Sequence, residues 1–211
     1  GSDMGEARTI GESEDVVRIM TIHKSKGLEF PVVFVAGMGK MFNTMDVKSS
    51  FLLHKDLGFG PMAVEPQLQV RYPSLAALGI RQQMRREMLA EEMRVLYVAL
   101  TRAREKLVLV GTAKDLGKSV TAWGRQGDGE RLHDEDLIQA KGYLDWVGRA
   151  LLRHPQAAPL RDYPRERGGE PVSVRTVPDD SSWSFHFYLA DRLQAESDAQ
   201  AEGHSVWERL T

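Results

Sequence analysis

Two short runs of the chain are apolar at nearly every position, and they restrict the possible folds more than any other feature. They read VVFVAG at 32–37 and KLVLVG at 106–111. A strand with one wet face alternates apolar and polar residues, whereas a strand covered on both faces does not. The two runs therefore predict buried parallel strands. Residues 75–103, where apolar side chains recur every three or four positions, predict a long helix, and this order favours an α/β domain with a mostly parallel sheet.

Shorter patterns predict the remaining elements, which are strands, a hairpin and two kinds of helix. The predicted elements are strands at 16–20, 172–177 and 183–189, a hairpin or irregular insertion at 51–64, one amphipathic helix at 134–154 (or two helices with a break at Gly142), and a polar helix at 191–200.

The composition excludes several classes of protein. The 211 residues include no cysteine, which excludes disulfides, thiolate zinc sites and a cysteine nucleophile. The six histidines lack the spacing of metal ligands, so no metal site is predicted. The net charge of −2 gives no global attraction to nucleic acid. No apolar run approaches the roughly 18 residues of a membrane span, so we expect a cytoplasmic protein.

The charge and the density of proline and glycine change near residue 154. Residues 1–154 carry a net charge of +2, and residues 155–211 carry −4. We therefore expect one domain at 16–154, followed by a linker and an acidic C-terminal segment at 155–211. Residues 1–15 are polar and begin with Gly-Ser, which is typical of a tag remnant and a disordered lead-in.

Two segments carry polar side chains whose chemistry suits phosphate and sugar groups. The first, IMTIHKSKGLEFP at 19–31, places Thr21, His23 and Lys26 on a loop that we expect to leave the carboxyl end of the strand at 16–20. Hydroxyl, imidazole and ammonium groups bind phosphate oxygens, and the carboxyl ends of parallel strands form the usual ligand edge of a sheet. A plain polar turn between strands is the alternative interpretation.

The second segment, EEMRVLYVALTRAREK at 91–106, ends a helix beside the next strand. Arg102 lies there, and its planar, permanently charged guanidinium suits a terminal phosphate. In the first segment, Gly27 permits close backbone approach, and the carboxylate of Glu29, which can only accept hydrogen bonds, suits sugar hydroxyls. The alternative is a basic helix end, which the helix macrodipole also favours.

In these residues the chain resembles the UvrD/Rep/PcrA-type superfamily 1 DNA helicases. Residues 19–38 resemble their motif V, and residues 91–111 resemble their motif VI. The flanking wording GMGKMFN, LGFG and KGYLDWVGRALLRHP resembles the AddA branch, which comprises helicase/nuclease subunits of AddAB double-strand-break repair complexes. The wide separation of the motifs also fits this branch, and it implies an insertion at about residues 40–83.

The resemblance implies a RecA-like motor domain, a P-loop NTPase-type three-layer α/β/α fold called 2A, which lacks its own P-loop. In such helicases ATP binds with Mg²⁺ between 2A and a first motor domain, 1A. Arg102 would be the catalytic arginine finger, and Glu29 and Gly27 would also contact ATP. Thr21, His23 and Lys26 would contact single-stranded DNA, and movement would run 3′ to 5′. An AddB-like second subunit, double-stranded DNA and the bacterial cytoplasm are implied as partners and setting.

The residues that such an enzyme needs to cradle phosphates are missing from this sequence. The closest candidate, Gly117-Lys118-Ser119, has Thr112 where a P-loop requires glycine. We therefore expect the Mg²⁺ ligands and a nuclease domain outside these 211 residues, and we predict that this chain alone hydrolyses no ATP. Two alternatives stay open: a non-catalytic helicase-like scaffold in a repair complex, and a RecB-type nuclease-fused helicase.

Overall fold

The structure is a computed structural model, and it describes residues 16–127, 129–191 and 193. The predicted lead-in at 1–15 and most of the predicted helix at 191–200 lie outside these residues. The chain divides into two compact units. The described part of the first comprises residues 16–38 and 42–110, and the second comprises residues 39–41 and those from 111 onward. The predicted helicase domain at 16–154 stays a prediction.

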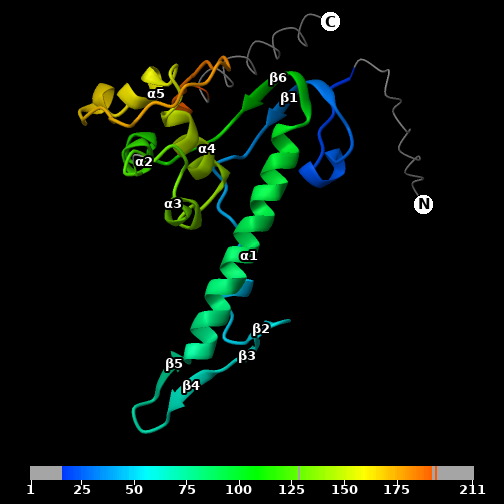
Figure 1. The fold of residues 1–211 in the computed structure, drawn as a ribbon, viewed down its shortest axis with the longest axis vertical. Coiled ribbons are helices and arrows are strands. Elements are labelled where there is room, and N and C mark those ends of the chain that lie inside the picture. Colours follow the sequence, from blue (N-terminus) through cyan, green and yellow to red (C-terminus); the bar gives the residue numbers. More distant parts are fainter. Residues whose placement is uncertain (1–15, 128, 192, 194–211) are drawn as a thin grey trace, which may run out of the picture. The chain divides into compact units, whose positions relative to one another are not determined.

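A parallel strand pair organises the first unit. Strand β1 (Phe30–Val35) pairs with β6 (Ala103–Leu109), and the register places Val33 beside Leu107 (Figure 1). This confirms the predicted parallel neighbours and the α/β class. The expected burial holds for Val35 but is wrong for Phe34, which is 69% exposed, because nothing among the described residues covers that side chain.

One helix connects the two strands along most of the first unit. Helix α1 (Leu75–Leu100) has 26 residues and confirms the predicted long helix. It begins where the Ser74 hydroxyl accepts a hydrogen bond from the backbone N–H of Ala77 (3.1 Å). It ends at Leu100, three residues earlier than predicted, because Ala103 already belongs to β6.

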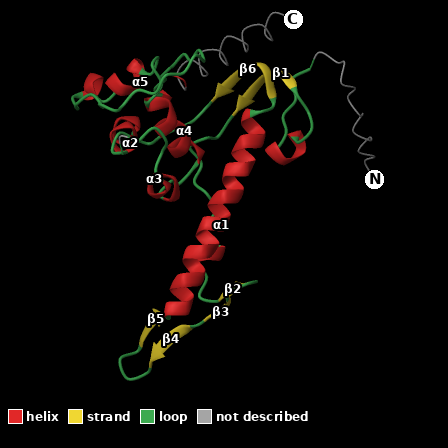
Figure 2. Cartoon of the chain, viewed as in Figure 1, coloured by secondary structure: helices red, strands yellow, loops and turns green. Residues whose placement is uncertain are grey.

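Two antiparallel hairpins lie at the far end of α1 (Figure 2). They confirm the predicted hairpin at 51–64, and a 3₁₀-helix, η2 (Asp46–Lys48), precedes them. The hairpin strands are β2 (Leu52–His54) with β3 (Gly58–Gly60), and β4 (Met62–Glu65) with β5 (Val70–Pro73). Leu52 packs with Ala77 and Ile80 of α1, whereas Leu53 is exposed, as the alternation of a strand requires.

The second unit is helical. Its helices are α2 (Leu116–Trp123), α3 (Asp134–Ile138), α4 (Tyr143–Leu152) and α5 (Ala158–Asp162), and a 3₁₀-turn, η3 (Arg165–Arg167), follows. The stretch 134–154 is therefore two helices with a break before Tyr143, as the second of our alternatives predicted. The indole N–H of Trp146 donates to the carbonyl of Leu137 across this break (2.9 Å).

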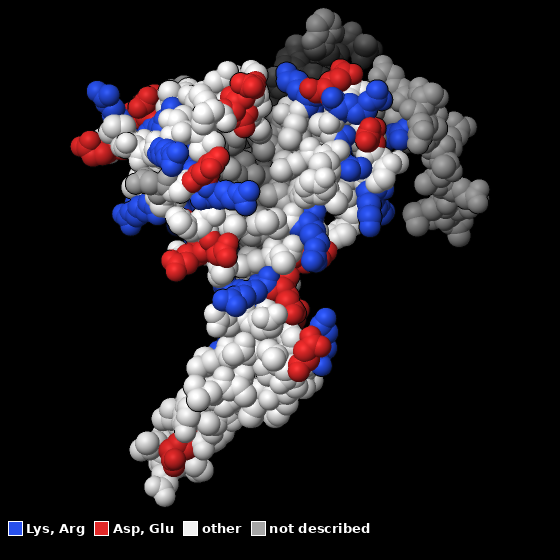
Figure 3. Space-filling view, in the orientation of Figure 1, with Lys and Arg blue, Asp and Glu red and all other residues white. Residues whose placement is uncertain are grey.

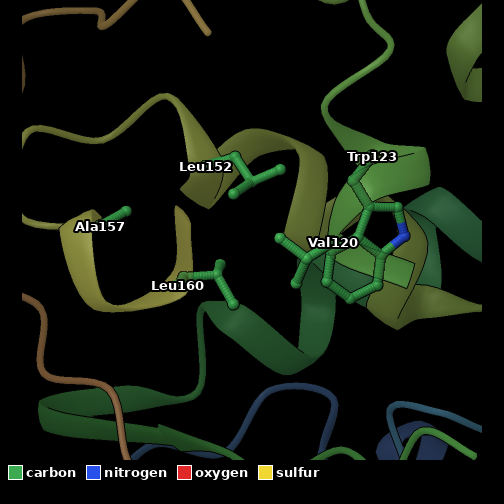
Figure 4. Packing of buried hydrophobic residues seen from close by; sticks show 5 residues of the cluster. All are labelled: Val120, Trp123, Leu152, Ala157 and Leu160. Carbon is green, nitrogen blue, oxygen red and sulfur yellow. The ribbon is translucent and has the colours of Figure 1, made fainter. Parts of the chain in front are cut away.

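A small apolar core holds these helices together. It comprises Val120, Trp123, Leu152, Ala157 and Leu160, all of them buried (Figure 4). Helices α2 and α4 approach closely at Gly148, where an added Cβ would lie 2.5 Å from Cε3 of the Trp123 ring. Only glycine allows this approach without displacing the ring.

Three predicted strands are wrong. Residues 16–20 form no strand, and neither do residues 172–177 or 183–189. A strand requires a neighbouring strand, and the described residues place none beside these segments. The backbone N–H groups of Val172 and Val177 donate instead to the carbonyls of Arg161 (3.0 Å) and Arg153 (2.8 Å). Val17 and Ile19 are instead almost fully exposed, whereas Val172, Val174 and Phe185 pack against the helical core.

Candidate functional site

The loop before β1 is built around one turn of 3₁₀-helix, η1 (Ile22–Ser25). Thr21 caps it, because its hydroxyl accepts a hydrogen bond from the backbone N–H of Lys24 (3.4 Å). Ser25 is buried, and its hydroxyl donates to the carbonyl of Ile22 (2.7 Å). Ser25 therefore shapes the loop. Thr21 also shapes it while its own O–H remains available as a donor.

The structure brings the predicted DNA-contacting residues together on this loop. Thr21, His23 and Lys26 are all exposed, and Gly27 directly follows them with a positive φ of 84°. Several Lys and Arg side chains, with Asp and Glu side chains among them, lie over the end of the first unit that carries η1 (Figure 3). Such a cluster of donors can meet a polyanion without first breaking a core contact.

Arg102 joins this loop to the end of α1. Its Nη1–H donates to the carbonyl oxygen of Leu28 (2.7 Å), and its Nε–H donates to the carbonyl of Val98 (2.9 Å). The backbone N–H of Phe30 donates to the carbonyl of Arg102 (2.9 Å). Glu29 therefore lies between two residues that Arg102 holds. The structure brings Glu29 and Arg102 together, although 73 positions separate them in the sequence.

The position of this junction in the sheet differs from the prediction. Glu29 precedes Phe30, the first residue of β1, and Arg102 precedes Ala103, the first residue of β6. The junction lies at the amino ends of the two strands and not at a carboxyl end. The reason is that residues 16–20 form no strand, so the loop leads into β1 instead of leaving an earlier strand.

Thr101 belongs to the same junction, and the sequence analysis missed it. Its hydroxyl oxygen accepts a hydrogen bond from Nη2–H of Arg102 (2.9 Å). Its hydroxyl hydrogen points to the carbonyls of Tyr97 (2.9 Å) and Val98 (3.1 Å). The signal that could have indicated it is a hydroxyl residue directly before the arginine at the predicted helix end.

The Gly117-Lys118-Ser119 segment forms the first turn of α2. Asp115 caps this helix by accepting from the backbone N–H of Lys118 (3.0 Å), and the Lys118 ammonium lies 3.1 Å from the same carboxylate. These two hydrogen bonds hold the pKa of Asp115 below its ordinary value, the backbone bond contributing most. The segment is a capped helix start and not a phosphate-binding loop.

A second polar cluster in the helical unit resembles a catalytic triad only by residue type. The Ser181 hydroxyl lies 3.4 Å from Nε2 of buried His154, and Asp179 accepts from the same hydroxyl. Nδ1 of His154 accepts from the backbone N–H of Gln156 (3.1 Å), so the ring proton is on Nε2. A nitrogen that carries a proton cannot activate Ser181, and the cluster is structural.

A hollow of about 1090 Å³ in the helical unit also carries arginines, Arg125, Arg131 and Arg149 among them. The buried Arg149 guanidinium pairs with the Asp136 carboxylate at 3.0 Å, which neutralises its charge. Among the described residues, no group of three or more His, Asp or Glu side chains is placed to hold a metal ion. In the same part of the chain, no helix is long and apolar enough to cross a membrane.

The structure brings both motifs together at one junction. This junction lies at the end of a parallel strand pair that one long helix connects. The family described as UvrD-like helicase C-terminal domain matches residues 4–114, which include both motifs. The chain belongs to this family.

Three much longer proteins that share one name are similar to most of this chain. The chain is 53% identical over 185 residues to the A subunit of the ATP-dependent helicase/nuclease of Heliobacterium modesticaldum, a match that covers 86% of the chain. It is 49% identical over 212 residues to the protein of the same name from Bacillus cytotoxicus, and 50% identical over 204 residues to that from Desulforamulus reducens, with 100% and 96% of the chain covered. The matches span only 13%, 17% and 16% of these three relatives, respectively.

Proposed function

We propose that this chain is the second motor domain, 2A, of an AddA-type ATP-dependent DNA helicase/nuclease. The complete fold would be RecA-like, with three α/β/α layers and a mostly parallel sheet, and residues 40–83 would be its insertion. The observation that carries the proposal is the junction at which Arg102 holds the backbone on both sides of Glu29. A helix end with a merely favourable charge would not require this connection.

At this junction, Arg102 would act as the arginine finger for ATP held mainly by the 1A domain. Three of its five N–H groups are used within the chain, which leaves one on each terminal nitrogen for a phosphate oxygen. Glu29 is exposed and would accept hydrogen bonds from the ribose, while Gly27 would let the backbone approach the nucleotide. ATP would supply the free energy for movement, with Mg²⁺ held by residues of 1A.

The loop would grip DNA. Thr21, His23 and Lys26 would donate hydrogen bonds to phosphates of single-stranded DNA. When the cleft between 1A and 2A closes on ATP, the DNA-gripping surfaces of the two domains would change their separation, and repeated cycles would move the enzyme 3′ to 5′.

The relatives all carry the name of the same helicase/nuclease polypeptide, and this name supports the AddA-type assignment over a RecB-type parent. We propose an AddB-like protein as the second subunit, broken double-stranded DNA as the substrate, and the bacterial cytoplasm as the setting. A non-catalytic scaffold is less favoured, because Glu29 and Arg102, the two residues that the ATP-contacting role requires, are both present and lie at one junction.

The test is Arg102→Ala in the complete enzyme, with Arg104→Ala as the matched control. Arg104 is an exposed arginine two residues further along the same motif. Loss of an arginine finger lowers phosphoryl-transfer rates by about 10³–10⁵-fold. We expect a loss of this order in ATP turnover for Arg102→Ala, with ATP still bound, and near-normal turnover for Arg104→Ala. Unchanged turnover in Arg102→Ala would refute the assignment.

A further inference from the structure

The guanidinium of Arg102 is held by all three of its nitrogens. Nε–H donates to the Val98 carbonyl (2.9 Å), Nη1–H to the Leu28 carbonyl (2.7 Å), and Nη2–H to Oγ1 of Thr101 (2.9 Å). Two of these acceptors are backbone carbonyls, which no substitution removes. Thr101 supplies the one side-chain acceptor.

The Thr101 hydroxyl is itself oriented by the end of α1. Its single hydrogen points to the carbonyls of Tyr97 (2.9 Å) and Val98 (3.1 Å). A hydroxyl that donates to these carbonyls must present its lone pairs on the other side, toward Nη2 of Arg102. The hydroxyl bond therefore fixes the Nη2 end of a guanidinium whose Nε and Nη1 are already held by two backbone carbonyls.

We propose that Thr101 is the positioning residue of Arg102, and that the Leu28 carbonyl couples this arginine to the DNA-contacting loop. Leu28 is two residues after Lys26 and directly before Glu29. A shift of the loop moves the carbonyl that accepts from Nη1, and the guanidinium must follow it or lose the bond. The inference rests on the proposed function, since it assumes that Arg102 contacts a phosphate.

Positioning and chemistry have different kinetic signatures. A group that orients an electrostatic contact made in the transition state changes kcat, whereas uniform binding changes KM. A hydrogen bond to a charged group, or a displacement of about 1 Å at a reacting centre, corresponds to roughly 10- to 100-fold in rate. Loss of the Thr101 hydroxyl should therefore cost less than loss of Arg102 itself.

The experiment compares Thr101→Val, Thr101→Ser and Arg102→Ala in the complete enzyme, with ATP turnover measured at saturating single-stranded DNA. Valine keeps the shape of threonine without the hydroxyl, and serine keeps the hydroxyl. We expect kcat to fall about 10- to 100-fold in Thr101→Val with KM nearly unchanged, and to recover in Thr101→Ser.

Each other outcome overturns a specific step. Normal turnover in Thr101→Val, with Arg102→Ala inactive, overturns the positioning role of Thr101 but still supports Arg102 as the arginine finger. Equal losses in the valine and serine variants show that the hydroxyl is not the relevant group. Normal turnover in Arg102→Ala overturns the proposed function and this inference with it.

A second measurement is independent of turnover. In ¹⁵N NMR spectra of the 211-residue chain, the held Arg102 guanidinium should give separate Nη signals, because its hydrogen bonds slow rotation about the Nε–Cζ bond. Thr101→Val should speed exchange between these signals, because only two of the three hydrogen bonds remain, and Thr101→Ser should leave the exchange as slow as in the unmodified chain. Averaged signals in the unmodified chain would contradict the proposal.

Discussion

Replacing Gly148 with alanine tests the packing of the helical unit. The new Cβ would lie 2.5 Å from Cε3 and 2.6 Å from Cζ3 of Trp123. Carbon atoms pack best at about 3.5–4.0 Å, so the ring or the helix must retreat by about 1 Å. The ring has little freedom to do so, because it is buried and its N–H donates to Asp145 (2.8 Å).

A matched control separates the packing cost from helix propensity. Gly79 lies inside α1, and an added Cβ there meets nothing within 4 Å. Both substitutions gain about 1 kcal/mol of helix propensity, but only Gly148→Ala incurs an overpacking cost of about 1–3 kcal/mol. The changes in unfolding free energy should therefore differ by about 1–3 kcal/mol, with Gly79→Ala the stabilising change.

Urea unfolding measures both changes. Trp123, Trp146 and Trp183 lie in the helical unit, so their fluorescence reports on it, whereas circular dichroism at 222 nm includes the long helix α1. We expect Gly148→Ala to lower the midpoint of the fluorescence transition and Gly79→Ala to raise the midpoint seen by circular dichroism. Equal stabilisation by both substitutions would refute the close packing of Gly148 on Trp123.

Three further predictions concern the first unit. Leu52→Ser should cost at least about 2–5 kcal/mol of unfolding free energy and Leu53→Ser less than about 0.5, because Leu52 is 1% exposed and Leu53 72%; equal costs in urea unfolding would contradict the register. Hydrogen bonds from Gln83, and then from His54, lower the pKa of Glu87 from 4.5, so its carboxylate stabilises the fold above that pH and less as the pH falls through the lowered value. Thermal unfolding of Glu87→Gln should therefore depend less on pH in the acid range, and identical profiles would count against this interaction. Lys26→Ala in the complete enzyme should make the salt dependence of single-stranded DNA binding shallower by about 0.7 in logarithmic slope, unlike Lys141→Ala, and titrations with equal slopes would exclude a phosphate contact.

The elements that the sequence predicted well are those whose pattern is local. The apolar runs at 32–37 and 106–111 became β1 and β6, and the periodicity of 75–103 became α1. The segment at 16–20 is rich in β-branched residues like β1, yet it forms no strand. Propensity belongs to the segment, but a strand also needs a partner, and the partner is not encoded in the same five residues.

The candidate site divides in the same way. Residue chemistry indicated Glu29 and Arg102, but the bond that joins the Arg102 guanidinium to the loop uses the carbonyl of Leu28, and every residue type has a carbonyl. No pattern of side chains could have indicated it. Thr101 was missed because a threonine at a helix end is ordinary, and only the position of its hydroxyl beside Nη2 distinguishes it.

Helix α1 places the Arg102 junction and the two hairpins at opposite ends of one rod. At 1.5 Å per residue, its 26 residues span about 39 Å. A tilt of about 10° around the junction would carry the hairpin end through about 7 Å. The helix is thus a lever with a short arm at the guanidinium and a long arm at the hairpins (Figure 1). The same rotation therefore displaces the hairpins several times further than it displaces Arg102. A distance probe on the hairpins would detect a rotation whose displacement at Arg102 is too small to measure.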